Sequence, residues 1–162
     1  MTFHKIRCHA KINLALNITG KTSQIHKIES IIAFISLHDL IMIKKINSNN
    51  HIILFKGKFS NKIGKRNSIS KLLELLEKKR LLDNQKFYIS VNKRIPIKAG
   101  LGGGSMNAAT ILRYLISKKI VKVNKKEINK ICKSIGSDVI LGLNFTNSIL
   151  TSKNEIKYFK NS

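Results

Sequence analysis

Pro96-Ile-Lys-Ala-Gly-Leu-Gly-Gly-Gly-Ser-Met-Asn-Ala-Ala109 joins a glycine-rich loop directly to the start of an apolar helix. The glycines at positions 100, 102, 103 and 104 remove side chains that would block close approach to the backbone, and they permit positive φ angles. We expect a helix over Ser105–Tyr114, and the N-terminal amides of a helix attract anions. The segment therefore predicts a site for a phosphate chain, and a nucleotide is the first ligand to consider.

The composition is that of one folded domain with a large excess of positive charge. The chain has 162 residues, 43% of them hydrophobic, which is enough for an ordinary core. The formal net charge is +23, from 31 Lys and Arg against 8 Asp and Glu, and such a charge attracts polyanions. The basic residues are scattered without interleaved aromatics, as on a solvated surface or after codon drift in an AT-rich genome. We therefore expect no nucleic-acid partner, and an RNA-binding module remains the alternative from another functional class.

The cysteines and the most apolar segment bear on the cellular compartment. Cys8 and Cys132 are far apart in sequence and lack metal-ligand spacing, so we expect two buried free thiols and no zinc site. The apolar segment Ile28–Ile43 is interrupted by Glu29 and by His38-Asp39, which argues against a transmembrane helix. The N-terminus lacks the pattern of a secretory signal. We expect a cytoplasmic protein without membrane contact.

Apolar periodicity predicts the remaining elements. Ile6–Asn17 alternates apolar and polar residues like a half-buried strand, with Lys11 and Asn13 on its polar face. Ser68–Leu82 has the spacing of an amphipathic helix with Ser68 as its N-cap. Further expected elements are strands over Ile31–Ile46 with a break near His38-Asp39, over His51–Phe55 and over Phe87–Val91, a helix over Lys125–Ile135 capped by Asn124 and ended by Gly136, and a hairpin of Ile149-Leu150 with Ile156–Phe159. This order describes an α+β domain rather than a regular alternation of strand and helix.

The glycine loop lacks the Gly-Lys-Ser/Thr ending of a Walker motif and the acidic partner of a dinucleotide fingerprint. Three segments in order carry a different resemblance: Ala10-Lys-Ile-Asn-Leu14, Pro96–Ala109 and Ile135-Gly-Ser-Asp-Val139. Together they resemble the small-molecule kinases named after galactokinase, homoserine kinase, mevalonate kinase and phosphomevalonate kinase. With the His26-x-x-Glu29-Ser30 segment, they are most similar to the members of that superfamily that act in the non-mevalonate isoprenoid pathway. The resemblance covers most of residues 5–160.

The resemblance implies a fold, a reaction and a cofactor. The fold would be the N-terminal domain of these kinases, of the ribosomal-protein domain 2-like type, with a mixed sheet and helices packed on one face. The reaction would transfer the γ-phosphoryl group of ATP, bound with Mg²⁺, to a hydroxyl of a small-molecule substrate, a cytidine-diphosphate-linked methylerythritol. Such a transfer depends on positioning and charge neutralisation more than on covalent chemistry by the protein.

The resemblance also assigns site residues. Asp138 matches the catalytic acidic residue that accepts the proton of the attacking hydroxyl, and Lys11 matches the lysine whose ammonium keeps that carboxylate ionised. Asn13 and His26 match substrate-binding positions, with His26 against the cytosine base. The positions that match the ATP-binding loop are Pro96, Ile97, Lys98, Ala99, Gly100, Leu101, Gly102, Gly103, Gly104, Ser105 and Met106.

Each of these assignments has a structural alternative. Asp138 follows Gly136-Ser137 and could simply close a helix end, since Asp is common in turns. Lys11 could be one of many solvated lysines, and His26 could be a lone surface histidine. Ser105 could cap the following helix, which is compatible with a contact to a phosphate or its metal.

The chain departs from the family pattern at ligand-facing positions. Ile25 replaces an aromatic residue that stacks on the cytosine, Ser23-Gln24 replaces an Asp-Gly turn, Met106 takes a serine position, and Ile140-Leu141-Gly142 replaces Pro-Phe-Phe. We expect residues 1–162 to form a single N-terminal kinase-type domain, with the C-terminal domain of the family absent. Two further hypotheses follow: a degenerate nucleotide-binding remnant, or half of a split kinase that a complementing C-terminal half completes.

Overall fold

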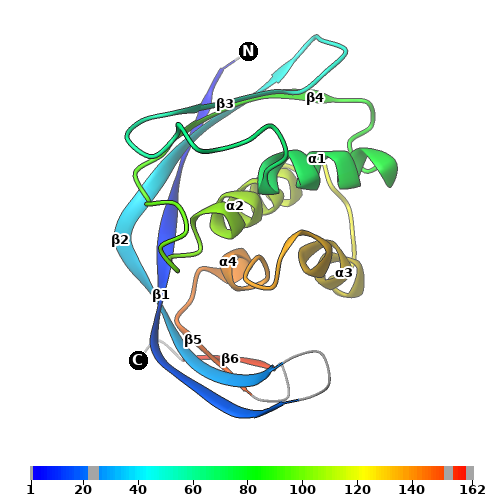
Figure 1. Cartoon of the computed structure of the whole chain (residues 1–162). Helices are drawn as coiled ribbons and strands as arrows, with labels where there is room; N and C mark the ends of the chain where they lie inside the picture. The colour runs from blue at the N-terminus through cyan, green and yellow to red at the C-terminus, as the bar shows by residue number, and fades with distance from the viewer. Residues whose placement is uncertain (1, 22–25, 152–154, 160–162) are drawn as a thin grey trace.

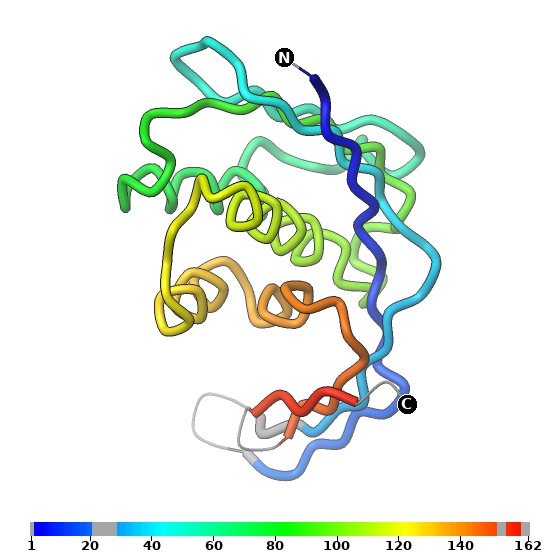
Figure 2. Tube along the Cα trace, turned by 180° about the vertical axis from the view of Figure 1, so that it is seen from behind, coloured from blue at the N-terminus to red at the C-terminus, as the bar shows by residue number. Residues whose placement is uncertain are grey.

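The computed structural model describes residues 2–21, 26–151 and 155–159, and in this part of the chain the strands form one sheet (Figure 1). The strands are β1 (His4–Lys21), β2 (His26–Ile46), β3 (Ile52–Lys56), β4 (Lys86–Asn92), β5 (Ser148–Leu150) and β6 (Ile156–Tyr158). β1 pairs along one edge of β2, and the two run side by side for most of the length of the molecule (Figure 2). β4 and β5 pair with separate parts of the other edge of β2. Only the pairing of β3 with β4 is parallel among these described strands, so the expected mixed sheet is confirmed.

The helices lie on one face of the curved sheet, as the α+β expectation required (Figure 1). They are α1 (Ser68–Lys78), α2 (Gly103–Ser117), α3 (Lys125–Ile135) and the short α4 (Leu141–Asn144). The core between helices and sheet includes Ile69, Leu72, Leu73 and Leu76 of α1, Ile111, Leu112 and Leu115 of α2, and Ile41, Ile43, Phe87, Ile89 and Val91 of the sheet. Burial of this apolar surface fixes α1 and α2 against each other and against the sheet, and both helices border the glycine loop.

The ends of α1 differ slightly from the sequence expectation. The N-cap is Asn67 rather than Ser68, because the Asn67 side chain accepts hydrogen bonds from two amides of the first turn. The helix ends at Lys78 rather than Leu82, because Arg80 adopts a left-handed conformation with φ of 56°. Both differences leave the predicted apolar face of the helix intact.

α2 begins at Gly103, earlier than the expected start at Ser105. Its N-cap is Gly102, which adopts a left-handed conformation and makes no side-chain cap. Ser105 therefore lies inside the first turn, and the hypothesis that it caps the helix was wrong. α3 has the predicted bounds, and its N-cap Asn124 accepts a hydrogen bond from the amide of Glu127 at 2.9 Å.

β1 follows the predicted alternation only in its first half. Cys8 and Ala10 are buried as expected, whereas two expected core positions farther along are exposed: Leu14 and Leu16. The register between β1 and β2 shifts three times, the first time between His9 and Lys11, so one strict alternation cannot continue. As a result Lys11 follows Ala10 into the interior.

β2 runs through His38-Asp39 without the expected break. His38 pairs with His9, and Asp39 pairs with Cys8. Asp39 is completely buried, which a strand tolerates only when the carboxylate is fully hydrogen-bonded. The polar residue that suggested a break instead marks a buried charge.

The remaining expectations on the cysteines and the chain end are confirmed. Cys8 and Cys132 are buried free thiols, and burial raises the pKa of Cys8 to about 12 and that of Cys132 to about 11. β5 and β6 form the predicted hairpin. Among the described residues, no helix combines the length and apolar character needed to cross a bilayer.

Candidate nucleotide-binding and phosphoryl-transfer site

The glycine loop and the start of α1 line a cavity of about 390 Å³. Ten of the expected ATP-binding positions, Pro96 to Ser105, contribute to its lining. Other lining residues were not identified from the sequence: Phe55, Lys62, Ile63, Asn67, Ser68, Ile69, Lys93 and Asn107. The lining therefore combines loop backbone with apolar and polar side chains, as ligand sites do.

The loop backbone adopts conformations that favour glycine, and it lies directly against β1. Gly100 and Gly102 have φ of 73° and 68°, and a Cβ at Gly102 would lie 2.9 Å from Cγ of Lys11. Because that distance is shorter than real Cβ contacts, a side chain at Gly102 would displace Lys11. The Lys11 amide also donates a hydrogen bond to the Leu101 carbonyl at 3.1 Å. The loop and Lys11 are thus held in one fixed arrangement.

Lys11 and Asp138, the two expected catalytic residues, lie together. Lys11 Nζ is 3.3 Å from Asp138 Oδ2 and donates a hydrogen bond to Asn13 Oδ1 at 3.2 Å. The Lys11 side chain is only 7% exposed, whereas the Asp138 side chain is 35% exposed. Lys11 is therefore not one of the solvated lysines, and the carboxylate beside it remains open to a ligand.

Ser105 connects the cavity to the turn that carries Asp138. It lines the cavity, and its Oγ lies 3.5 Å from the position that a Cβ at Gly136 would occupy. Gly136 ends α3 and is followed closely by Asp138. The first turn of α2 therefore borders the cavity and also contacts the turn that carries Asp138.

The buried carboxylate of Asp39 forms hydrogen bonds with residues at both ends of the loop. Asp39 accepts hydrogen bonds from the amides of Arg94 and Ile95, at 2.8 and 2.9 Å, and from Asn107 Nδ2 at 3.0 Å. It also forms an ion pair with Lys93, and both side chains are almost completely buried. The sequence contained a usable signal, because a charged residue in an otherwise apolar strand must find partners when the strand is buried.

One expected ligand-binding residue, Met106, lies away from the cavity, and another, His26, has a side chain that the structure does not describe. Met106 is fully buried beside Gly142 of α4, and its amide donates to the Gly102 carbonyl at 2.8 Å. It does not line the cavity, because it belongs to the interior face of α2. His26 begins β2, but its side chain lies outside the described part of the structure, as do Ser23, Gln24 and Ile25.

The site has features that suit a nucleotide with its metal. Asn107 is 2% exposed and lines the cavity, yet its Oδ1 has no hydrogen-bond partner among the described residues. The first amides of any helix also lack acceptors within the helix. The described residues contain no cluster of three or more His, Cys, Asp or Glu. Mg²⁺ is commonly bound through substrate phosphates and water rather than by a cage of protein ligands, so a magnesium ion that arrives with the nucleotide would need few protein ligands here.

The family comparison matches the same region. The family described as GHMP kinases N terminal domain matches residues 67–146, which contain the glycine loop, α2 and Asp138. Residues 67–146 thus match the N-terminal domain of the GHMP kinases, and the relatives and solved structures extend this likeness along the chain. It is 55% identical over 161 residues to a protein of Pelagibacter ubique (strain HTCC1062) named 4-diphosphocytidyl-2-C-methyl-D-erythritol kinase, covering 99% of this chain and 57% of that one. A protein of the same name from Finegoldia magna is 37% identical over 135 residues, covering 83% of this chain and 48% of the relative.

Solved structures agree on the fold. A crystal structure of 4-(cytidine 5'-diphospho)-2C-methyl-D-erythritol kinase superposes with a TM-score of 0.77 at 25% identity, covering 96% of this chain and 55% of that one. A mevalonate kinase structure superposes with a TM-score of 0.62 at 15% identity and supports the fold alone. This chain spans about half the length of the curated relatives that it matches.

Proposed function

We propose that this chain supplies the ATP-binding and catalytic half of a 4-diphosphocytidyl-2-C-methyl-D-erythritol kinase. The observation that carries the proposal is the Lys11–Asp138 pair at 3.3 Å, seated where the first turn of α2 meets the cavity lined by the glycine loop. Two relatives with that name match 83% or more of the chain. The reaction is the transfer of the ATP γ-phosphoryl group to a hydroxyl of the cytidyl methylerythritol.

In this proposal the loop backbone, Asp138 and Lys11 have different roles. The loop backbone from Pro96 to Ser105 binds the phosphates of ATP, because helix N-termini and bare amides attract anions. Asp138 orients the attacking hydroxyl and accepts its proton, while the Lys11 ammonium stabilises negative charge beside it. Mg²⁺ bound with the nucleotide would add charge neutralisation at the phosphates.

Asn13 and His26 are the proposed contacts to the substrate. Asn13 accepts a hydrogen bond from Lys11 at 3.2 Å, which places its side chain beside the proposed catalytic pair. His26 is proposed from the family resemblance of its segment. The rest of the cytidine pocket would come from a complementing C-terminal half, since relatives of that name are about twice as long as the matched region. In this proposal residues 1–162 are a single kinase-type domain.

Calorimetric titration with ATP and Mg²⁺ tests the nucleotide site in the chain alone. We expect saturable binding that Gly103→Val abolishes, because a Cβ at Gly103 would already lie 3.1 Å from Cγ2 of Ile95. Normal ATP binding by Gly103→Val would contradict the assignment. Circular dichroism of the variant at the titration temperature shows whether it is folded.

Turnover is tested by ADP release with the cytidyl substrate, with and without the part of the Pelagibacter ubique relative that this chain does not match. Asp138→Asn should reduce turnover by about two to four orders of magnitude, as loss of a general base does. Its ATP affinity should change little, and Asp83→Asn, the same substitution at an exposed position, should retain full turnover. Undiminished phosphorylation by Asp138→Asn would refute its proposed role.

A further inference from the structure

The two ends of the glycine loop are tied to the sheet by one buried carboxylate, that of Asp39. Its Oδ1 accepts the amides of Arg94 and Ile95, which are the residues that lead into the loop. Its Oδ2 accepts Asn107 Nδ2 from α2, which is the helix that leads out of the loop. One side chain of β2 thus holds both ends of the segment between Arg94 and Asn107.

The same carboxylate fixes a cation at the cavity. Lys93 lines the cavity and pairs with Asp39, and the two side chains are 4% and 0% exposed. Lys93 Nζ lies 3.2 Å from the position that a Cβ at Gly103 would occupy, so the ammonium lies beneath the first residue of α2. Without Asp39 this ammonium would be buried without a charged partner, which is strongly destabilising.

The geometry points to Asp39 as a positioning residue for phosphoryl transfer. Asp39 does not line the cavity and forms no hydrogen bond to Lys11 or Asp138 within the described part of the chain, so it would act through the loop that is proposed to bind the phosphates. This inference rests on the proposed function, because it assigns Asp39 to the loop of that site. Misplacement of binding groups by about 1 Å is enough to cost much of their contribution to rate and affinity.

The test compares the nearly isosteric Asp39→Asn with Asp83→Asn, which makes the same change at an exposed position. Hydrogen exchange followed by mass spectrometry is measured without nucleotide on peptides covering residues 94–106 and residues 68–78 of α1. In Asp39→Asn the loop peptide should exchange about fivefold faster while the α1 peptide is unchanged, as for local rather than global opening. The dissociation constant for ATP with Mg²⁺ should rise about tenfold or more. Asp83→Asn should change neither quantity.

A second variant keeps the test decisive if Asp39→Asn does not fold. Asn107→Ala removes only the attachment at α2, in a helix that favours alanine, and should produce a smaller increase in loop exchange. Unchanged loop exchange in the folded variants, or equal acceleration of the loop and α1 peptides, would overturn the positioning role. If the wild-type chain binds no ATP, the proposed function fails, whereas the exchange comparison still decides whether Asp39 holds the loop.

Discussion

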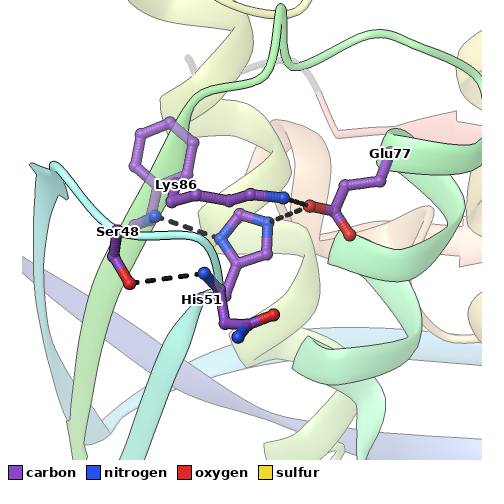
Figure 3. Close-up of polar contacts among 6 residues, drawn as sticks. Ser48, His51, Glu77 and Lys86 are labelled. Atoms are coloured by element: carbon purple, nitrogen blue, oxygen red, sulfur yellow. Dashed lines mark hydrogen bonds and ion pairs between the residues drawn. The ribbon is translucent and has the colours of Figure 1, made fainter.

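β4 has a lysine at each end, and the two ion pairs that these lysines form differ in burial. Lys86 opens the strand and pairs with Glu77 of α1, whose side chain is 35% exposed (Figure 3). Lys93 follows the strand and pairs with Asp39, which is fully buried. Breaking a solvent-accessible ion pair costs little free energy, because water can solvate both charges. Removing one partner of a buried pair is costly, because the remaining charge has neither water nor a counter-ion. The same kind of ion pair, a lysine with a carboxylate, therefore lies near the surface at one end of β4 and beneath a ligand site at the other.

The largest contrast is expected when each carboxylate is removed. Asp39→Ala should destabilise the folded chain by about 3–5 kcal/mol, because it leaves the Lys93 ammonium buried and unpaired. Urea unfolding followed by circular dichroism measures this loss, and Glu77→Ala is the matched variant at the other end of β4. Equal losses of unfolding free energy in Asp39→Ala and Glu77→Ala would show that burial does not distinguish the two ion pairs.

Removal of the buried lysine sharpens the comparison. Lys93→Met should cost less than Asp39→Ala, about 1.5–3 kcal/mol, because Asp39 keeps three neutral donors and loses one charged hydrogen bond. The same urea experiment checks the order of the two losses. A greater loss for Lys93→Met would mean that the hydrogen bonds from the backbone and Asn107 contribute little to holding the carboxylate.

The partly exposed Lys86–Glu77 pair should respond weakly to loss of charge alone. Glu77→Gln keeps the size of the side chain, and we expect a change of about 0–1 kcal/mol, as for other surface ion pairs. The measurement is the urea midpoint at low and at high salt, since salt screens exposed charges. A loss comparable to that of Asp39→Ala would show that the pair is effectively buried.

The smallest effect is a pH dependence at the same end of β4. His51 Nδ1 accepts the Phe87 amide at 3.0 Å, and its Nε2 lies 3.1 Å from Glu77 Oε1 (Figure 3). Burial lowers the pKa of His51 from its ordinary value of 6.5, so the folded chain binds fewer protons than the unfolded chain near that pH. The contribution of His51 to stability is therefore complete above pH 6.5 and is lost as the pH falls toward the folded-state pKa.

The predicted loss of stability on acidification is tested by measuring the thermal unfolding midpoint between pH 8 and about pH 5.5, roughly the range in which an ordinary histidine titrates. The wild-type midpoint should fall on acidification, and His51→Gln should show a flatter profile. The lowered pKa of Glu77, caused mainly by its hydrogen bond from Lys86, affects stability only at more acidic pH. A midpoint that rises on acidification through this range would contradict the assignment to His51.

The sequence predicted the parts of the site that are formed by short motifs. The glycine loop, Lys11 and Asp138 could be identified because their spacing along the chain matches a known pattern, and the fold then brings them together. The helix α3 was predicted with its bounds because Asn124 and Gly136 are strong local signals for its two ends.

The parts that the sequence did not predict depend on contacts between distant segments. A strand break was predicted near Asp39 because a charged residue is unusual in an apolar strand. The four donors that allow its burial come from residues 93–107, which no local pattern links to β2. Met106 was assigned to the nucleotide because it stands in the motif, but the direction of its side chain is set by packing of α2 on α4. The exposure of Leu14 likewise follows from shifts in register that alternation alone does not reveal.

The proposed catalytic pair joins the first strand of the chain to the turn after its third helix. During synthesis on a ribosome, Lys11 emerges early and remains without its carboxylate partner until almost all of the described elements have been translated. Such distant pairing is slow to form, because the intervening chain must be ordered first. A nascent chain would therefore assemble the proposed catalytic pair only after α3 has been translated, so the glycine loop would be in place before its carboxylate partner arrives.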